Sequence, residues 1–206
     1  MAISLNDIRE QFAKINATME ENKELLTQLD SAIGDGDLGL TMTTGFAAIV
    51  KFFEGDVGPD IGKTLMQAGM AMNNAASSTM GTLLSSAILR MGQTVRNKTE
   101  LNEADLVEMF KAGIKGIQER GKAEVGDKTI LDALVPAVEA FAASIEKGEG
   151  TKEAFSQAAI AAEQGFDGTA EMVSKHGRGH YYGEKSRGHK DPGAAVGMLI
   201  FQALRD

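Results

Sequence analysis

Residues 4–19, SLNDIREQFAKINATM, decide the fold class of this chain. The apolar side chains of this stretch recur at steps of three and four residues, namely at Leu5, Ile8, Phe12, Ile15 and Met19. That spacing places them on one face of an α-helix. Ser4 and Asp7 resemble a capping pair at the start of the same helix. The stretch therefore predicts an amphipathic helix that buries one apolar stripe.

The same helical period continues along the rest of the chain. Helices are expected over residues 25–33, 41–53 and 130–145, and others are expected to start at Pro59, Ser77–Thr79, Asn102, Thr151 and Pro192. Pro136 should kink the helix over 130–145 or mark its true start. No sustained alternation of apolar and polar residues occurs, so strands are not expected. Because the connections are short, we predict one all-α domain over residues 1–206, an up-and-down bundle or closed barrel of antiparallel helices.

The composition argues against several classes of protein. The chain has 206 residues, no cysteine and a formal net charge of −8. Without cysteine there are no disulfides, thiolate-bound zinc ions or cysteine nucleophiles. The negative charge argues against a nucleic-acid partner, since duplex binding requires a basic face. No run of about 18 apolar residues is present to span a membrane, and the N-terminus lacks the features of a secretory signal. The expectation is a cytoplasmic protein.

Three aspartates cluster in LDSAIGDGDLG, residues 29–39. The carboxylates of Asp30, Asp35 and Asp37 would repel one another unless a cation lay between them, so the cluster indicates a site for a hard metal ion. The intervening glycines allow the sharp turn that such convergence requires. A solvated acidic turn is the alternative, because Asp and Gly are ordinary loop residues. The spacing does not fit the calcium loop of an EF-hand.

A basic segment contrasts with the acidic chain. Residues 174–191, SKHGRGHYYGEKSRGHKD, contain more Lys and Arg than acidic residues, together with all the histidines and tyrosines of the protein. Such a segment indicates a local anionic ligand. The Ser77–Thr79 cluster at a predicted helix start would offer backbone amides to phosphate oxygens. Neither of the common glycine-rich phosphate-binding motifs is present. Asp127 is expected to cap the helix that follows it.

Four stretches resemble motifs of the L subunit of dihydroxyacetone kinase, the nucleotide-binding half of that enzyme. They are LDSAIGDGDLG, SSTMGTLL, GDKTILDALVP and YYGEKSRGHKDPGA, and they fall in the order and spacing of that family. The resemblance covers the chain from its first helix to its end. It implies a barrel of eight amphipathic antiparallel helices with ADP or ATP at one end, and two Mg²⁺ ions held by Asp30, Asp35 and Asp37.

The resemblance also implies the nucleotide contacts. The residues that match them are Leu38, Gly39, Leu40, Thr41, Ser77, Ser78, Thr79, Gly121, Ile130, Arg178, Lys190, Asp191 and Pro192. No catalytic residue is implied beyond the metal ligands. Two positions depart from the family pattern, since Leu38 stands where His is common and Thr41 where Asn is frequent. The serine cluster reads SSTMG in place of the usual S-G-P or S-G-A.

The implied partner is a K subunit that binds the sugar, with a phosphocarrier M subunit as one source of the phosphoryl group and free ATP as the other. Two alternatives stay open. The chain could serve a kinase for another short sugar or polyol, or it could be a nucleotide-gated module that binds a regulator. The sequence leaves the oligomeric state, monomer or homodimer, undecided.

Overall fold

Nine α-helices dominate the part of the chain that the structure, a computed structural model, describes, which is residues 2–205. In chain order the elements are β1 (Ile3–Ser4), α1 (Leu5–Glu21), α2 (Lys23–Ile33), α3 (Leu38–Phe53), α4 (Ile61–Ala75), α5 (Thr79–Thr94), β2 (Glu100–Leu101), α6 (Glu103–Gly121), α7 (Leu131–Glu146), α8 (Gly150–Gly168), the 3₁₀ segments η1 (Thr169–Glu171) and η2 (Arg178–Ser186), and α9 (Pro192–Arg205).

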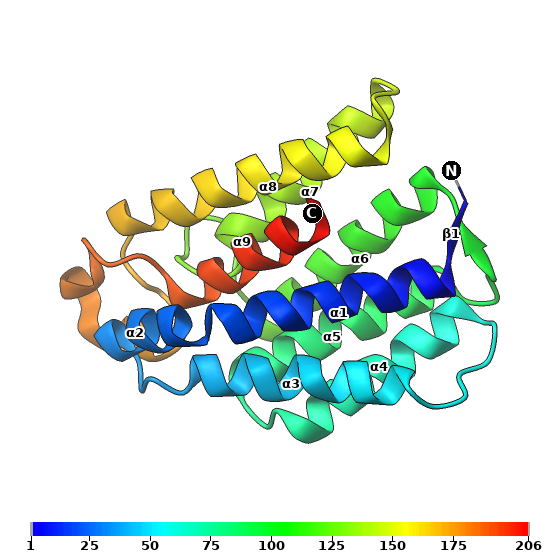
Figure 1. The fold of residues 1–206 in the computed structure, drawn as a ribbon. Coiled ribbons are helices and arrows are strands. Elements are labelled where there is room, and N and C mark those ends of the chain that lie inside the picture. Colours follow the sequence, from blue (N-terminus) through cyan, green and yellow to red (C-terminus); the bar gives the residue numbers. More distant parts are fainter. Residues whose placement is uncertain (1, 206) are drawn as a thin grey trace.

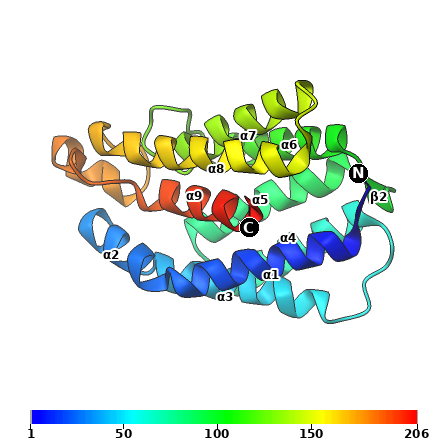
Figure 2. The ribbon, with the colours of Figure 1, turned by 45° about the horizontal axis from the view of Figure 1, so that its top comes forward.

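The helices close into a ring (Figures 1 and 2), and their buried side chains form one apolar core. Helix α1 packs against α3 and α9, and α3 to α9 follow one another around the ring in chain order. Helix α2 continues α1 after a break at Asn22 and also packs between α3 and α9. Counting α1 and α2 as one, the ring has eight members. The predicted closed barrel of about eight amphipathic antiparallel helices is confirmed.

Polar caps set most of the helix starts. Ser4 with Asp7 and Asn102 with Asp105 form complete capping boxes at α1 and α6. Pro59 was expected in the first turn of a helix, and this is wrong. Asp60 caps α4 by accepting the Lys63 amide, so Pro59 lies before the cap.

One further helix boundary differs from expectation, and the alternative that Pro136 marks the start of its helix is wrong. Helix α3 begins at Leu38, three residues before the predicted start, because the Asp30 carboxylate accepts the amides of Asp37 and Leu38. Helix α7 begins at Leu131, so Pro136 lies inside it. Proline has no amide to donate to the Asp132 carbonyl. Gly165 of α8 packs against that carbonyl, and a Cβ at Gly165 would lie 2.1 Å from the oxygen.

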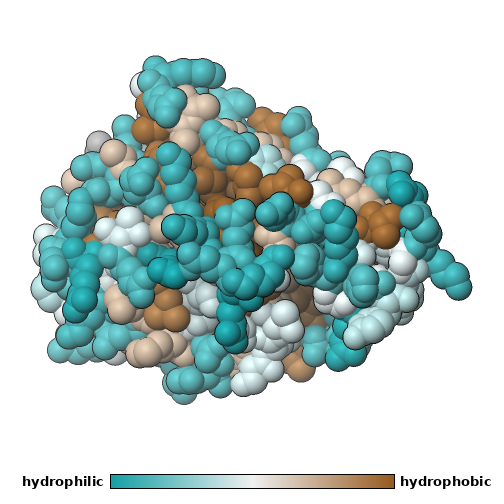
Figure 3. All heavy atoms as spheres, turned by 180° about the vertical axis from the view of Figure 1, so that it is seen from behind, coloured by the Kyte–Doolittle hydropathy of each residue, from teal (hydrophilic) through white to brown (hydrophobic). Residues whose placement is uncertain are grey.

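Small and aromatic side chains share the core around α7 and α8. Ala154, Ala158 and Ala162 of α8 are fully buried, which allows α8 to approach α7 closely. Phe141 of α7 and Phe155 of α8 pack with their ring centroids 4.8 Å apart. Seen from behind, the surface is mostly hydrophilic, with small groups of hydrophobic side chains between the polar ones (Figure 3).

The two ends of the barrel differ. At one end β1 pairs antiparallel with β2, with Ile3 opposite Leu101, the only strands among the described residues. At the other end lie the turn from α2 to α3 and the segment between α8 and α9 (Figure 1). None of the helices described is both long and apolar enough to cross a bilayer. The candidate site lies at the end opposite the strands.

Candidate functional site

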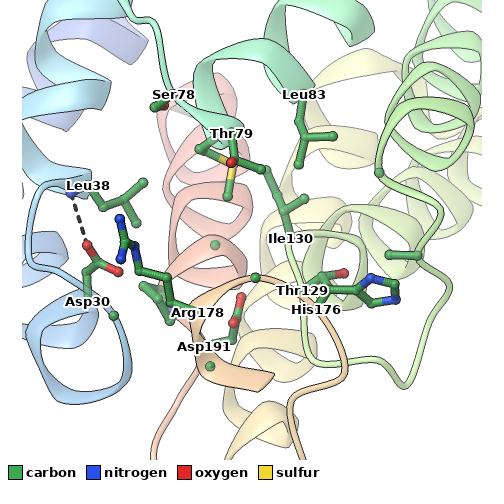
Figure 4. A pocket seen from close by; sticks show the side chains of 18 of the residues that line it. Asp30, Leu38, Ser78, Thr79, Leu83, Thr129, Ile130, His176, Arg178 and Asp191 are labelled. Carbon is green, nitrogen blue, oxygen red and sulfur yellow. Dashed lines mark hydrogen bonds between the residues drawn. The ribbon is translucent and has the colours of Figure 1, made fainter. Parts of the chain in front are cut away.

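The three predicted metal ligands do converge. Asp30 lies on the last turns of α2, and Asp35 and Asp37 lie in the turn to α3. One oxygen of each carboxylate lies within 4.8 Å of the others. The turn is held by the Asp30 Oδ2 atom, which accepts the Asp37 amide at 3.0 Å and the Leu38 amide at 3.2 Å (Figure 4). Gly36 has a φ of 75°, a backbone conformation that glycine adopts without strain.

The electrostatics of the cluster suit a cation. Burial raises the pKa of the Asp30 carboxyl above its ordinary value, and the charges of Asp35 and Asp37 add to the effect, although the two amide hydrogen bonds oppose it. The space beside Asp30 depends on Gly34, since a Cβ there would lie 2.1 Å from the Asp30 Oδ1 atom. Carboxylate oxygens are the ligands that Mg²⁺ prefers. The donor set and the space beside it therefore fit a divalent cation.

A pocket of about 1240 Å³ opens beside the aspartates. Its walls come from the α2–α3 turn, the start of α5, the end of α6, the turn before α7 and the segment between α8 and α9. Leu83 and Ile130 supply an apolar side, while Ser78, Thr79 and Arg178 supply polar atoms (Figure 4). Ile117 adds to the apolar side. The pocket is thus polar toward the aspartates and apolar on the side of α5, α6 and Ile130.

Four helices begin at this end of the barrel, α3, α5, α7 and α9, because the up-and-down topology reverses direction at each step. A carboxylate lies at three of these starts. Asp30 accepts amides at α3, Asp132 accepts the amides of Gly126 and Thr129 before α7, and Asp191 accepts the Ala194 amide in α9. Only the hydroxyl of Ser78 caps α5, by accepting the Gly81 amide at 3.0 Å.

Most of the predicted nucleotide contacts lie around this pocket. Those that line it are Leu38, Ser77, Ser78, Thr79, Gly121, Ile130, Arg178, Asp191 and Pro192. The Arg178 guanidinium reaches across to the aspartate cluster and lies 2.5 Å from the Asp35 Oδ2 atom. Stretches far apart in the sequence therefore meet at one site.

Four predicted contacts do not line the pocket. Gly39, Leu40 and Thr41 continue α3 away from it; Gly39 packs on the Lys23 carbonyl of α2, and Leu40 is 59% exposed. The Lys190 ammonium donates to Asp167 at 2.7 Å and lies over the Phe166 ring, 4.8 Å from its centroid. The positive charge of Lys190 is thus paired on the outside of the barrel.

Asp191 differs from the other predicted contacts because its carboxylate is enclosed. The carboxylate accepts the Ala194 amide at 2.7 Å, and the Asp191 amide donates to the Thr169 hydroxyl. Burial raises the pKa of the Asp191 carboxyl to about 7. Its first role is therefore to cap α9.

Other wall residues were not predicted from the sequence. Thr129, Ser174, His176 and Tyr181 line the pocket. The expectation that Asp127 caps α7 is wrong, because the N-cap residue of α7 is Ile130 and the helix has no side-chain cap. The Asp127 carboxylate instead pairs with the Lys175 ammonium at 2.7 Å and with the His176 Nε2 atom at 3.1 Å. The only sequence signal for Asp127 was its position in GDKT. The sequence did not show that the basic segment 174–191 would pack beside it.

The fold is an all-α barrel, and at one end of it a cluster of carboxylates and several helix N-termini surround a pocket. These features place the chain in the class of helical domains with a candidate divalent-cation site. The particular family follows from comparison with known proteins. Residues 32–206 match the family model of the DAK2 domain, and the chain belongs to that family. Asp30 lies just before the matched range.

Relatives include proteins of nearly the same length. The chain is 35% identical over 204 residues to the ADP-binding subunit DhaL of the PEP-dependent dihydroxyacetone kinase of Escherichia coli (strain K12), covering 99% of this chain and 97% of that protein. It is 30% identical over 202 residues to the ADP-binding subunit DhaL of the PTS-dependent dihydroxyacetone kinase of Lactococcus lactis, covering 98% and 97%.

Larger proteins contain a similar domain. The L-erythrulose 1-kinase of Mycolicibacterium smegmatis is 33% identical over 186 residues, which are 89% of this chain and 32% of that protein. The crystal structure of the dihydroxyacetone kinase from C. freundii in complex with AMP-PNP and Mg²⁺ superimposes with a TM-score of 0.78 at 23% identity. It matches all of this chain but only 34% of that one, and it confirms the fold.

Proposed function

We propose that this chain is the nucleotide-binding subunit of a dihydroxyacetone-type kinase, holding ADP or ATP through two Mg²⁺ ions on Asp30, Asp35 and Asp37. The observation that carries the proposal is the convergence of the three carboxylates at the polar side of a pocket large enough for a nucleotide. Full-length similarity to ADP-binding subunits of such kinases supports it.

The residues divide into three roles. Asp30, Asp35 and Asp37 hold the cations, which when bound neutralise and orient the phosphates. The start of α5, with Ser77, Ser78 and Thr79, supplies donors to phosphate oxygens, and Arg178 adds a positive charge on the opposite side. Gly121 and Ile130 flank the adenine; a Cβ at Gly121 would lie 3.1 Å from Leu83, so glycine keeps that wall open. Phosphoryl transfer requires mostly such positioning and neutralisation of charge.

The reaction is completed by partners. We propose that the sugar, a short keto-sugar such as dihydroxyacetone, is held by a separate K subunit in the cytoplasm. Supporting this, the relatives of similar length are named as subunits, and the larger kinases contain this domain as about a third of their length. We propose a phosphocarrier M subunit as the donor that recharges ADP; the relatives from Escherichia coli and Lactococcus lactis are named as subunits of PEP-dependent and PTS-dependent kinases, which favours this source over free ATP.

The test is a binding measurement on the purified chain followed by a reconstituted assay. Native mass spectrometry should detect bound ADP, and calorimetry should show ADP binding that depends on Mg²⁺ and is lost in Asp35→Asn. Sugar phosphorylation should require an added K subunit. Binding of ADP that is unaffected by EDTA would contradict the metal-bridged site, and efficient phosphorylation by the isolated chain would contradict the division of labour.

A second candidate is a kinase subunit for another acceptor, with free ATP as donor. The similarity to an L-erythrulose 1-kinase favours keeping it. A panel of short keto-sugars and polyols, assayed with the K subunit and with either ATP or the phosphocarrier, separates the two candidates. Turnover of a four-carbon keto-sugar with ATP alone would select the second.

A further inference from the structure

The wall of the pocket between α8 and α9 has little hydrophobic support. We call residues 172–190 the site loop. It contributes Ser174, His176, Arg178 and Tyr181 to the pocket, yet its buried residues are two polar ones, Ser174 and Ser186. Segments with few buried apolar contacts open easily. Polar contacts must therefore determine how stable the conformation of the site loop is.

Lys128 supplies the central contact. Its side chain is 1% exposed, and its ammonium donates to the backbone carbonyls of Met172 at 3.1 Å, Ser186 at 2.5 Å and His189 at 2.6 Å. An ammonium has three N–H donors, so all of them are used. The acceptors lie at both ends of the site loop, and one buried cation thus ties its two ends together.

The backbone at Lys128 supports a specific role. Its φ is 60°, a left-handed conformation that is unfavourable for a non-glycine residue and persists only where the surroundings impose it. Burial lowers the pKa of the Lys128 ammonium, while the nearby Asp191 carboxylate opposes that shift. A buried ammonium bonded to neutral carbonyls is an expensive arrangement, and simple packing of a core would not require it.

Other contacts add to this one or are weaker. The Ser186 hydroxyl accepts the Ser174 amide at 2.9 Å and donates to the Gly183 carbonyl at 2.6 Å, which fixes the base of the site loop internally. The ion pair of Arg178 with Asp35 is largely exposed to solvent. Exposed ion pairs contribute little. Asp127 also holds the loop, since its carboxylate pairs with Lys175 and His176 and its carbonyl accepts the Lys175 amide, but the Lys175 and His176 side chains are partly exposed. The Lys128 contacts differ because they are buried and join both ends of the loop to the barrel.

We propose that Lys128 is a positioning residue whose buried ammonium fixes the site loop as a wall of the pocket and thereby controls the rate at which nucleotide leaves. This inference rests on the proposed nucleotide-binding function. It assigns to Lys128 no contact with the phosphates. Lys128 itself lines the pocket, but its three N–H donors are taken up by the loop carbonyls, and through them it positions the wall residues Ser174 and Arg178.

The test compares Lys128→Met with Lys185→Met, the same change at an exposed lysine of the site loop. Hydrogen exchange of the nucleotide-free proteins reports the loop directly, through the amides of Ser174 and Gly188, which are hydrogen-bonded in the structure. In Lys128→Met these amides should exchange at least about tenfold faster, while those of α8 keep the wild-type rate. A fluorescent ADP with Mg²⁺ should dissociate at least about tenfold faster. Lys185→Met should match wild type in both.

The outcomes separate this inference from the proposed function. Unchanged exchange and unchanged ADP release in Lys128→Met would overturn the role of Lys128 while leaving nucleotide binding intact. If wild type bound no ADP, the proposed function would fail. Faster exchange in Lys128→Met would then still show that Lys128 holds the loop, but the control of nucleotide release would be refuted. If Lys128→Met does not fold, Lys128→Gln, which keeps a side-chain donor but loses the charge and the third N–H, takes its place; wild-type exchange and release in that variant would also overturn the proposal.

Discussion

Replacing Asp30 with Asn should separate the stability of the barrel from its response to Mg²⁺ and ADP. Asn has almost the same shape, and its side-chain oxygen can still accept the amides of Asp37 and Leu38, which lie at 3.0 and 3.2 Å in the wild type. The change removes one negative charge from a cluster whose ligand oxygens lie within 4.8 Å of one another.

The effect on stability is a balance of opposing contributions. Two unit charges about 5 Å apart repel by about 1 kcal/mol in water and about 3.5 kcal/mol at an effective dielectric constant of about 20. Because Asp35 and Asp37 are exposed, the lower value applies, which gives about 2 kcal/mol for both neighbours. The substitution also weakens two amide hydrogen bonds by about 1 kcal/mol each. These contributions nearly cancel.

Burial decides the sign. The pKa of the Asp30 carboxyl is raised, so its ionised form is less stable in the folded protein than in the unfolded chain. Such a group reduces the stability of the folded state increasingly as the pH rises through its pKa. At neutral pH without Mg²⁺, Asp30→Asn should therefore be as stable as wild type or slightly more stable.

Thermal unfolding with and without Mg²⁺ and ADP measures both effects. Ligand at about 100 times its Kd stabilises a protein by about 2.7 kcal/mol, which corresponds to a rise in Tm of about 5–10 °C for a chain of this size. Wild type should show that rise, and so should Asp56→Asn, an exposed acidic residue outside the cluster. Asp30→Asn should show almost none. A full rise in Asp30→Asn would refute the assignment of the cluster as the metal site.

Two other substitutions test packing and pH dependence. Gly165→Ala should lower the free energy of unfolding by about 1–3 kcal/mol, because the new Cβ would lie 2.1 Å from the Asp132 carbonyl and α8 must move. Chemical denaturation checks this against Gly168→Ala, where no atom lies within 4 Å; equal losses in both variants would contradict the packing argument. Asp191→Asn should raise the Tm more at pH 8 than at pH 5, because the buried carboxyl has a pKa of about 7 and its ionisation opposes folding above that pH. A gain in Tm that is larger at pH 5 than at pH 8 would contradict the raised pKa of Asp191.

Much of this architecture follows from local rules. Apolar residues at helical spacing, together with caps such as Ser4 and Asn102, predict where the helices lie, and the short connections predict an up-and-down order. The aspartate cluster is equally local, since the glycine-separated carboxylates lie close together in the sequence. These features require no knowledge of which residues meet across the barrel.

The errors arise where distant segments meet. Asp127 was interpreted as a cap, but its partners Lys175 and His176 lie almost 50 residues further along, on a segment without helical period. The nucleotide contact of Lys190 stays a prediction; in the structure its ammonium pairs with Asp167 and lies over the Phe166 ring, two partners that no local pattern indicates. The role of Lys128 could not be predicted although it lies in the quoted GDKT stretch, because that role depends on backbone carbonyls of a loop whose path the sequence does not specify.

The topology also explains how an acidic protein can hold an anionic ligand. In an up-and-down barrel every second helix begins at the same end, so four positive helix ends face the pocket. Carboxylates at the starts of α3, α7 and α9 offset three of them, whereas α5 has only the hydroxyl of Ser78. Phosphate oxygens are therefore favoured at the start of α5. The excess negative charge of Asp30, Asp35 and Asp37 then requires cations between that helix and the α2–α3 turn, and metal binding and phosphate binding should each strengthen the other.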